Sequence, residues 1–527
     1  MKASLKKLPA LVLAASVAWA AGCGIETQVI GVVVDDDLND LRTMMLLARG
    51  TNSELTDIFA AADYARIAWA ATDEGMVGAS TSETGDHRYA VSQYHLRPGG
   101  GAYTQAMEAS WAGILSAQRI AKVDAEYGVD PQTDPLVARM WLNSGLAERQ
   151  LGEMFCQANY RFGPEGGFLL EGSGDNYDRS VIVSNDSIFR RVITFADLAI
   201  EQAQRGVAAD VVVPEGWYLF DPQVVLTSAY GLKAQAHLIL EEWDLADQFA
   251  TLALAQPGGT LPPTEGNLQS GGSGIDYVEF THYNDDTEDN DTHIHFHRDD
   301  EGGLWNTPAA IQWADDPRLP QVRCGEFKEG VTPGGSKSSS NFYNYSDRPG
   351  CNQEIDNEYR VENNRYPRWV QLKYFDRGAD YEMVTGTEMV LIKAEVALRK
   401  GQMTEFETLI NQHRAFWDLP PLAESDPQAF PLVAGALEYP NAEDDGWSIL
   451  DRERYADLWL EGRRRKDMER WNHPFWTEGH YITVEQATMN PPGPRPYTCF
   501  PMPSNECGSN ELIRTQEVCA KLPTPGG

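Results

Sequence analysis

Cysteine, long apolar runs and catalytic signatures are all scarce in this sequence. Its 527 residues include seven cysteines, and no two of them form a C-x-x-C pair. A structural zinc site is therefore not expected, because paired cysteines at that spacing are its usual sequence mark. Beyond the first twenty or so residues, no apolar run is long enough to cross a bilayer as a helix. A nucleophile elbow, a Gly-rich phosphate loop and an H-E-x-x-H motif are also absent, so no enzyme activity is predicted.

Basic residues are also few. The chain carries 43 Lys and Arg against 78 Asp and Glu, which gives a formal net charge of -35. Such a surface repels phosphate backbones and anionic lipid headgroups. Nucleic acid is therefore not an expected partner.

The N-terminus departs from this acidic character. Lys2, Lys6 and Lys7 precede the apolar run LPALVLAASVAWA, and small residues then lead to Cys23 in AAGC. This pattern predicts a bacterial export signal over residues 1–22. AAGC resembles the lipobox of bacterial lipoproteins, which implies that Cys23 is acylated and that membrane attachment comes from this lipid alone. The alternative is an ordinary signal peptide in which Cys23 has no role.

The cysteines beyond Cys23 form an even set, which suits disulfides in an exported chain. They are Cys156, Cys324, Cys351, Cys499, Cys507 and Cys519. Plausible pairs are Cys324 with Cys351, and two of the three cysteines in the tail. The sequence alone leaves the pairing open.

Apolar residues at three- and four-residue spacing predict helices that come in pairs. After helices expected between 35 and 80, the predicted segments are 102–128, 134–156, 184–206, 221–255 with a break near Trp243, and 386–422 with a joint at Gly401. Ala-rich helix pairs in series are typical of a helical-repeat scaffold, in which each pair buries its face on the next.

The composition of the sequence changes after the first set of predicted helices. Residues 257–374 are rich in Gly, Pro, Asn, Asp and aromatics, with little periodicity. A loop-rich excursion of this length is more often functional than idle, so it is expected to bind ligand. The predicted fold is mainly α, with a scaffold of helix pairs, one large irregular region and few short strands. Within a single mature domain, 23–527, the expected parts are N-terminal helical repeats (35–256), the excursion (257–374), a C-terminal helix pair with a charged helix (375–472) and an irregular tail (473–527).

The most basic stretch of this acidic chain is LWLEGRRRKDMERW, residues 458–471, with five Lys and Arg in eight positions. If residues 452–471 form one helix, apolar side chains occupy two of its faces, so it is expected to be packed on both. Its charges are then matched inside the protein, and an ion-paired core helix is favoured over an exposed basic patch. The expected i,i+4 pairs are Glu461 with Arg465 and Arg463 with Asp467.

The stretch ERYADLWLEGRRRKDMERW follows the pattern E-R-R-x-E-L-x-x-E-G-x-R-x-x-D-L-x-R-W. The matching residues are Glu453, Arg454, Leu458, Glu461, Gly462, Arg464, Asp467, Arg470 and Trp471. Tyr455 stands where the pattern has Arg, which is the largest departure. The stretch thereby resembles the SusD/RagB family of starch-utilisation-type outer-membrane lipoproteins. Further landmarks in family order are DDPRLP (315–320), Lys373 with Tyr374, the Glu388–Gly401 segment and CFPMPSNE (499–506).

The resemblance implies tetratricopeptide-like helix pairs that cradle an irregular region, and a lipid-anchored protein of the outer membrane that is exposed at the cell surface. It also implies capture of oligosaccharides, or peptides in some members, and delivery to a SusC-like TonB-dependent transporter. Family members are not catalysts. On this interpretation a structural role falls to Arg454, Glu461, Gly462, Arg464, Asp467, Arg470 and Trp471.

Ligand binding should then fall on the excursion. Aromatic rings stack on the apolar faces of pyranoses, while amides, carboxylates and Arg bind the hydroxyls. The candidate ligand-binding residues are Trp305, Trp313, Phe342, Tyr343 and Tyr345. For each ring taken singly, burial between loop and scaffold is the competing interpretation.

A second constellation is NDDTEDNDTHIHFHRDD, residues 284–300. In an extended strand His293, His295 and His297 would share one face, and Asp285 and Asp286 offer oxygen ligands. Calcium is the better metal candidate here, but a solvated acidic loop that leads into a short strand is favoured over any metal site. No other cofactor is expected.

Two other functions stay open. One is a helical-repeat adaptor of the envelope that binds no small ligand. The other is a surface glycan hydrolase, because a chain with 78 carboxylates always leaves room for a glycosidase pair. A transporter gene beside this one would favour capture and delivery.

Overall fold

A computed structural model describes most helical parts of the chain. The described residues are 39–60, 68, 72, 74, 101–160, 181–214, 217–257, 274–276, 278–281, 316–323, 325–327, 342–344, 360–361, 366–367, 369–373, 381–422, 445–471, 499–509 and 512–516.

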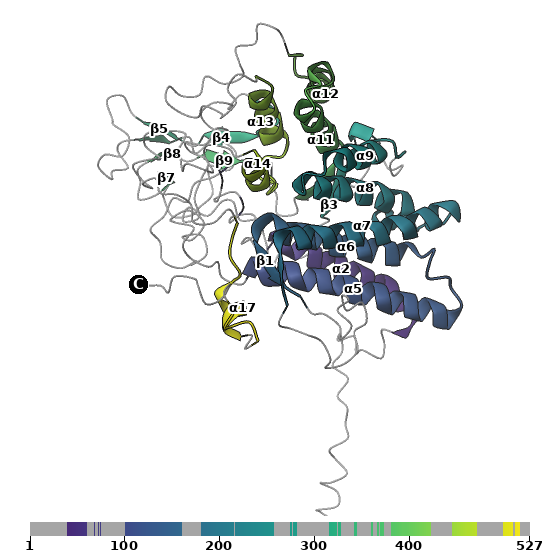
Figure 1. The fold of residues 1–527 in the computed structure, drawn as a ribbon. Helices are drawn as coiled ribbons and strands as arrows, with labels where there is room; N and C mark the ends of the chain where they lie inside the picture. Colours follow the sequence, from purple (N-terminus) through teal and green to yellow (C-terminus); the bar gives the residue numbers. More distant parts are fainter. Residues whose placement is uncertain are drawn as a thin grey trace, which may run out of the picture.

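Six helices of the N-terminal half stack side by side (Figure 1). They are α2 (Leu41–Ala60), α5 (Gly101–Tyr127), α6 (Pro135–Met154), α7 (Asn185–Ala208), α8 (Pro222–Ile239) and α9 (Trp243–Leu254). From α5 onward each helix packs on the next in the chain, while α2 covers α5 and α6. The predicted scaffold of paired helices is confirmed, including the break before Trp243.

Two of these helices begin at the same dipeptide, Asp-Pro. Asp134 accepts a 2.7 Å hydrogen bond from the Leu136 N–H, and Asp221 accepts one of 2.8 Å from the Gln223 N–H. Proline follows at the first helical position of α6 and of α8, where its missing N–H costs nothing. Local sequence therefore sets where α6 and α8 start.

A second group of helices continues the stack. α11 (Gly386–Arg399) packs on α9 and on α12 (Met403–Phe416). α13 (Asp445–Asp457) packs on α11 and α12. Gly401 has a φ of 67°, which explains the tight turn between α11 and α12 at the predicted joint. The short helices α14 (Arg464–Arg470) and α17 (Ser504–Ser509) follow, and the 3-10 turns are η2 (Tyr218–Phe220) and η3 (Gly274–Asp276).

Among the described residues, the strands are short and pair two by two, all antiparallel. The pairs are β1 (Gln157–Asn159) with β2 (Ile182–Ser184), β3 (Val278–Thr281) with β10 (Tyr381–Thr385), β4 (Gln321–Arg323) with β9 (Trp369–Gln371), β5 (Gly325–Phe327) with β6 (Phe342–Asn344), and β7 (Arg360–Val361) with β8 (Tyr366–Pro367). Strands β4, β5, β7, β8 and β9 lie to one side of the helical stack, beyond α13 and α14 (Figure 1). The few short strands agree with the predicted fold class.

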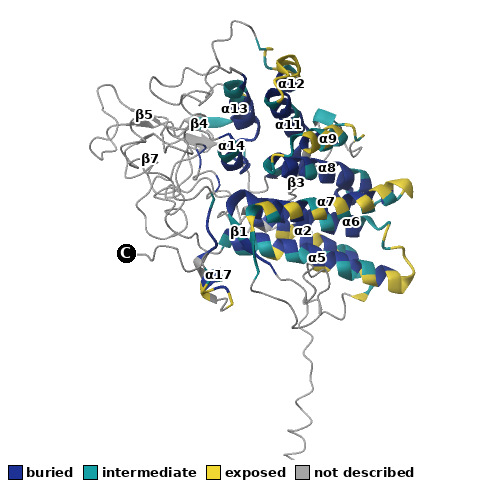
Figure 2. Ribbon diagram, viewed as in Figure 1, coloured by how far each residue is buried: buried dark blue, intermediate teal, exposed yellow. Residues whose placement is uncertain are grey.

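The main core runs through the middle of the stack. It contains Leu146 of α6, Ala196 of α7 and Leu232 of α8, and it extends to Met389 of α11 and to Trp459. Figure 2 shows these inner helix faces as buried, with exposed residues along the outer edges. The core therefore joins the N-terminal helices to the segment that carries the basic cluster.

The predicted single helix over residues 452–471 is wrong. The chain forms α13 up to Asp457, leaves helical geometry, and resumes as α14 at Arg464. Leu460 and Gly462 have φ values of 63° and 77°, in the left-handed region that breaks a right-handed helix. The backbone N–H of Leu460 donates a 2.7 Å hydrogen bond to Oε1 of Glu74, far away in the sequence. Tertiary contacts thus stabilise a break in the helix that the apolar periodicity of the sequence does not predict.

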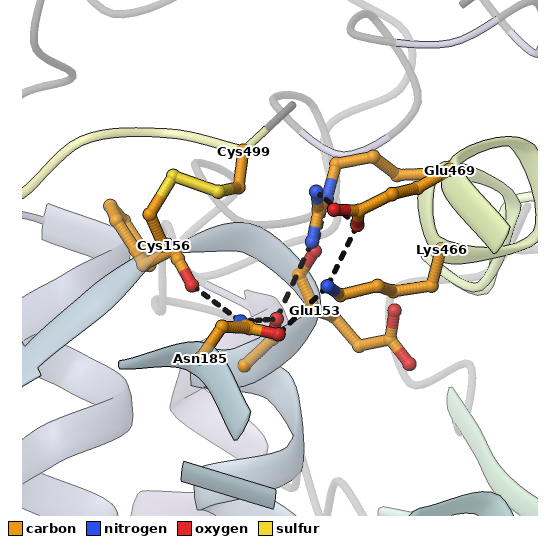
Figure 3. The surroundings of a disulfide bond; sticks show 9 residues. Glu153, Cys156, Asn185, Lys466, Glu469 and Cys499 are labelled. Carbon is orange, nitrogen blue, oxygen red and sulfur yellow. Dashed lines mark hydrogen bonds and ion pairs between the residues drawn. A yellow bond between two sulfur atoms is a disulfide. The ribbon is translucent and has the colours of Figure 1, made fainter. Parts of the chain in front are cut away.

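The tail cysteine Cys499 is bonded to Cys156, at the end of α6, with a Cα–Cα distance of 5.1 Å (Figure 3). Cys499 therefore does not belong to the pair predicted within the tail, which leaves Cys507 and Cys519 as its possible members. Cys507 is also disulfide-bonded, to a cysteine outside the described residues. Cys324, Cys351 and Cys519 lie outside them too.

Candidate functional site

The D-P-R turn at residues 316–318 is attached to the helical scaffold by buried ion pairs. Arg318 Nη1 donates to Oε2 of Glu453 on α13 at 2.5 Å, and its Nη2 donates to Oδ2 of Asp316 at 2.7 Å. All three side chains are almost wholly buried. A planar guanidinium bound by two carboxylates fixes both the position and the orientation of the turn.

Helix α12 contacts the same carboxylate. Arg414 Nη1 donates to Oε1 of Glu453 at 2.7 Å, and the ring of His413 lies 3.3 Å from Glu453 and 3.1 Å from Asp457. Burial opposes the charge on Glu453, but His413, Arg318 and Arg414 outweigh it and hold the pKa of this carboxyl well below its usual range. Burial likewise opposes the charge on His413, and the two carboxylates nevertheless raise its pKa.

A third attachment comes from Lys373, which follows β9. Its Nζ lies 2.5 Å from Oε1 of Glu461 and 2.8 Å from Oε2 of Glu382 on β10. Burial raises the pKa of Glu461, and the adjacent Glu382 adds to this, although Lys373 opposes it. We call one set of buried or partly buried ion pairs the charged anchor; its residues are Asp316, Arg318, Lys373, Glu382, His413, Arg414, Glu453, Asp457 and Glu461. It ties the start and the end of the β4–β9 region to α12, α13 and the turn before α14.

The basic cluster itself is buried and paired, as the sequence predicted. Arg454 binds Asp467 through Nε at 2.8 Å and Nη2 at 2.9 Å, and Arg470 binds Glu395 of α11 at 2.7 and 2.8 Å. Arg464 donates to Asp451. Most partners of the basic residues in this cluster, however, come from other segments of the chain.

The two i,i+4 pairs predicted for this cluster are wrong. Arg463 Nη2 lies 3.6 Å from Glu388 and 3.7 Å from Glu461, while Asp467 pairs with Arg454 and Arg470. Arg465 Nε donates instead to the backbone oxygen of Glu153, at the end of α6. The break at residues 458–463 removes the helical register between Glu461 and Arg465. Arg463 and Asp467 keep that register, since the Asp467 N–H donates to the Arg463 oxygen at 3.2 Å, but their side chains bind other partners.

Most predicted ligand and metal residues lie outside the described residues. These are Asp285, Asp286, His293, His295, His297, Trp305, Trp313 and Tyr345, and the predicted lipidation site Cys23 lies outside the described residues too. Phe342 and Tyr343 lie on β6, where their backbones pair with Phe327 and Glu326 of β5. Among the described residues, no group of three or more His, Cys, Asp and Glu side chains is arranged to hold a metal.

One cavity of about 670 Å³ opens between α9, α11 and α12. Its lining residues are Asp247, Lys393, Val396, Ala397, Lys400, Gly401, Gln402, Met403, Thr404, Glu405 and Leu409. None of these is aromatic, so the cavity lacks the flat apolar surface on which a pyranose stacks. It does not resemble the predicted sugar site.

Sequence reasoning named Glu461, Arg464, Asp467 and Arg470 but missed several partners in the charged anchor and in the basic cluster. His413 and Arg414 lie in the last turn of α12, and no local sequence pattern predicts that they contact Glu453, about forty residues later. Glu395 was noticed as part of a motif, yet nothing in the sequence paired it with Arg470. Only the packing of α12 and α11 against α13 and α14 brings these groups together.

The sequence model of the SusD family matches residues 272–506, which hold the D-P-R turn, Lys373 and the α13–α14 segment. A search of curated proteins finds no significant match to the chain. Among the described residues, no helix is long and apolar enough to pass through a bilayer.

Solved structures share the fold over nearly the whole chain. A SusD/RagB family protein from Bacteroides thetaiotaomicron is 13% identical with a TM-score of 0.52, and the alignment covers 90% of this chain and 95% of that one. A SusD superfamily protein from Bacteroides vulgatus is 14% identical with a TM-score of 0.52, over 92% of this chain and 100% of that one. A laminarin-binding SusD-like protein is 13% identical with a TM-score of 0.50, over 88% and 97%.

Proposed function

Because this chain belongs to the SusD/RagB family, we propose that it is a cell-surface protein that captures an oligosaccharide and delivers it to a SusC-like TonB-dependent transporter. The observation that carries the proposal is the family match over residues 272–506. In the structure, that stretch contains the charged anchor's contacts from Arg318 and Lys373 to the scaffold. The anchor gives an irregular region a fixed base, and a binding loop needs such a base if it is to present its side chains in one arrangement.

The ligand class rests on two further points. A protein of similar fold is described as laminarin-binding, which makes a glycan the first class to test. The excursion of this chain also contains tryptophans and tyrosines among Asn and Asp, the combination that sugar recognition uses. The proposed binding residues are Trp305, Trp313, Phe342, Tyr343 and Tyr345.

Isothermal titration calorimetry against a panel of glycans and peptides tests the proposal. We expect one glycan to bind with micromolar to millimolar affinity, and Trp305→Ala or Trp313→Ala to weaken that binding roughly tenfold. Tyr127→Ala is the matched control, since Tyr127 is an exposed aromatic residue at the end of α5, on the scaffold. Its affinity should equal that of the wild type.

The other outcomes of this titration would support a different function or a different binding site. If no glycan or peptide binds, the adaptor function gains support. If a glycan is consumed by the purified protein, the chain is a hydrolase. Binding that Tyr127→Ala weakens as much as the tryptophan variants do would move the site away from the excursion.

Delivery and anchoring need separate tests. A tagged chain purified in mild detergent from its native membranes should co-purify with a TonB-dependent transporter. In cells that lack the transporter, Cys23→Ala should abolish fatty-acid labelling and release the chain from the membrane fraction, because the lipid is the proposed attachment to the bilayer. A variant that stays membrane-bound without the lipid would contradict the proposed anchor.

A further inference from the structure

Exposed apolar side chains gather at one end of the helical stack. Among the described residues, ten large apolar side chains are exposed, and six of them lie in the first turns of α2, at the ends of α5 and α7, or in the loop after α7. We call these six residues the apolar end; they are Leu41, Leu46, Tyr127, Val129, Val207 and Val212. Because soluble proteins rarely gather such side chains on the surface without a partner, the apolar end is a candidate contact surface.

The segments that carry the apolar end are neighbours in space. One buried cluster contains side chains from α2, α5, α6 and η2. Trp217 packs against this cluster, and Cζ of Arg49 on α2 lies 3.8 Å from the centre of its ring. Helix α7 joins them through Arg205, whose Nη1 donates to Oε1 of Gln132 in the α5–α6 turn at 2.7 Å. These residues mark the end of the stack where α5 turns into α6, whereas β1, which follows α6, lies at the opposite end (Figure 1).

The chain enters the scaffold at the same end. The described residues begin at Asn39, two positions before α2, and Cys23 precedes Asn39 by 16 positions. Even along a fully extended chain, an acyl group on Cys23 would lie no more than about 55 Å from Asn39. Because the lipid is attached to this side of the scaffold, it holds the apolar end, and not the end at β1, nearest to the bilayer.

The charges around the apolar end are close to balanced, although the whole chain has a net charge of -35. Three ion pairs lie there, namely Arg42 with Asp40, Lys122 with Glu126, and Arg205 with Glu201. Two further exposed acidic residues, Asp130 and Asp210, face one further exposed basic residue, Arg49. A lipid surface therefore meets little net charge at this end, and the repulsion expected of the acidic body is weak here.

We propose that the apolar end rests on the lipid surface of the membrane beside the acylated N-terminus, with its apolar side chains at the level of the lipid headgroups. The inference rests on the proposed lipidation of Cys23. Tyr127 suits this depth, because its ring is apolar while its hydroxyl stays hydrated. Since the lipid already keeps the two surfaces close together, a contact too weak to hold the free chain is sufficient. The contact would hold the body in one orientation relative to the bilayer.

Hydroxyl-radical footprinting of the full-length mature chain tests this contact. The acylated chain is placed on vesicles of phosphatidylcholine and phosphatidylethanolamine without other protein, and oxidised side chains are mapped by mass spectrometry. The Cys23→Ala chain, free in solution, is the comparison. We expect oxidation of Leu46, Tyr127 and Val212 to fall roughly threefold or more on the vesicles, because lipid covers them. Leu512, which is 56% exposed against 61% for Leu46 but follows α17, should be oxidised equally in both states.

Paired variants separate a lipid contact from attachment by the acyl group alone. Leu46→Asp with Val212→Asp places two charges in the apolar end and should restore the oxidation of Tyr127 to the level of the free chain. Met403→Asp with Leu512→Asp adds the same charges elsewhere and should leave Tyr127 protected. All four substituted side chains are exposed, so neither pair should change the fold, and circular dichroism checks this.

Two results would overturn the proposal. One is equal oxidation of Tyr127 on the vesicles and in solution. The other is protection that develops only after a TonB-dependent transporter is added to the vesicles, because the apolar end then contacts a protein. Fatty-acid analysis of the same preparation tests the lipidation separately. If Cys23 carries no fatty acid, the proposed lipidation is wrong, and a hexahistidine tag in its place, bound to a nickel-chelating lipid, still shows whether lipid covers this end.

Discussion

Arg318 Nη1 donates a 2.5 Å hydrogen bond to Oε2 of Glu453 across 135 residues of sequence. Oε1 of the same carboxylate accepts from Arg414 at 2.7 Å. Glu453 therefore neutralises two buried guanidinium groups from two different segments. Because the site is enclosed, loss of this one carboxylate would leave positive charge that water cannot reach.

We expect Glu453→Gln to lower the free energy of unfolding by about 3–5 kcal/mol, since it leaves buried charges without their partner. Urea denaturation followed by circular dichroism measures this. Asp40→Asn is the control, because Asp40 pairs with Arg42 at the same 2.5 Å while the Arg42 side chain is 89% exposed. Its stability should be unchanged within error. An equal loss in both variants would contradict a special role for the buried pair.

The same carboxylates set the response to acid. Although burial opposes it, Arg470 and Arg399 hold the pKa of Glu395 well below its usual value of 4.5, and the groups around Glu453 do the same for that residue. An unfolded chain takes up these protons near pH 4.5, before the folded one does. The stabilisation is therefore complete above that pH and is lost as the pH falls below it.

We expect the melting temperature of the wild type to fall steeply between about pH 5 and pH 3. Glu453→Gln should show a shallower fall, because one of the responsible groups no longer titrates. Differential scanning calorimetry across this range measures both slopes. Parallel curves would show that other carboxylates account for the acid response.

The contribution of Asp124 to stability depends on pH in the opposite direction. It is buried near the end of α5, and burial together with the neighbouring Asp134 raises its pKa to about 8. The folded chain keeps a proton that the unfolded chain releases near 3.8. This contribution is complete below that pH and is lost as the pH rises through about 8.

Asp124→Asn should therefore stabilise the protein at alkaline pH, by roughly 1–3 kcal/mol at about pH 9 relative to about pH 4. Thermal melts at several pH values give the difference between variant and wild type. Asp130→Asn neutralises an exposed carboxylate in the same α5–α6 turn and is the control. If Asp130→Asn changes stability relative to the wild type by the same amount over this pH range, burial of Asp124 is not the cause.

Gly462 lies in the turn between α13 and α14 with a φ of 77°. We expect Gly462→Ala to destabilise the protein by about 1 kcal/mol or more, because a Cβ disfavours the left-handed region. Gly50 provides the comparison, since it lies in α2 and a Cβ there would meet nothing within 4 Å. Gly50→Ala should stabilise by about 0.5–1 kcal/mol. If chemical denaturation shows that both variants change the free energy of unfolding in the same direction, this account of the turn is refuted.

Several features of the fold could be predicted from local sequence. The apolar period located the helices from α5 to α12, the Asp-Pro pairs fixed where α6 and α8 begin, and Gly401 marked the turn after α11. These signals act within one or two helical turns, because capping and amphipathic spacing involve neighbours a few residues apart. The same reasoning predicted that the charges of residues 463–470 would be buried and paired, since apolar residues surround them.

The sequence by itself thus determined the helices, the burial of the basic cluster and the membership of a family. Only the tertiary structure decided which carboxylate each cation meets, that the helix breaks at Leu460 and Gly462, and that Cys499 bonds to Cys156. Each of these depends on segments far apart in the chain, as with Arg318 and Glu453 or Leu460 and Glu74. No local pattern encodes such a meeting, because the packing of whole helices against one another determines which groups become neighbours.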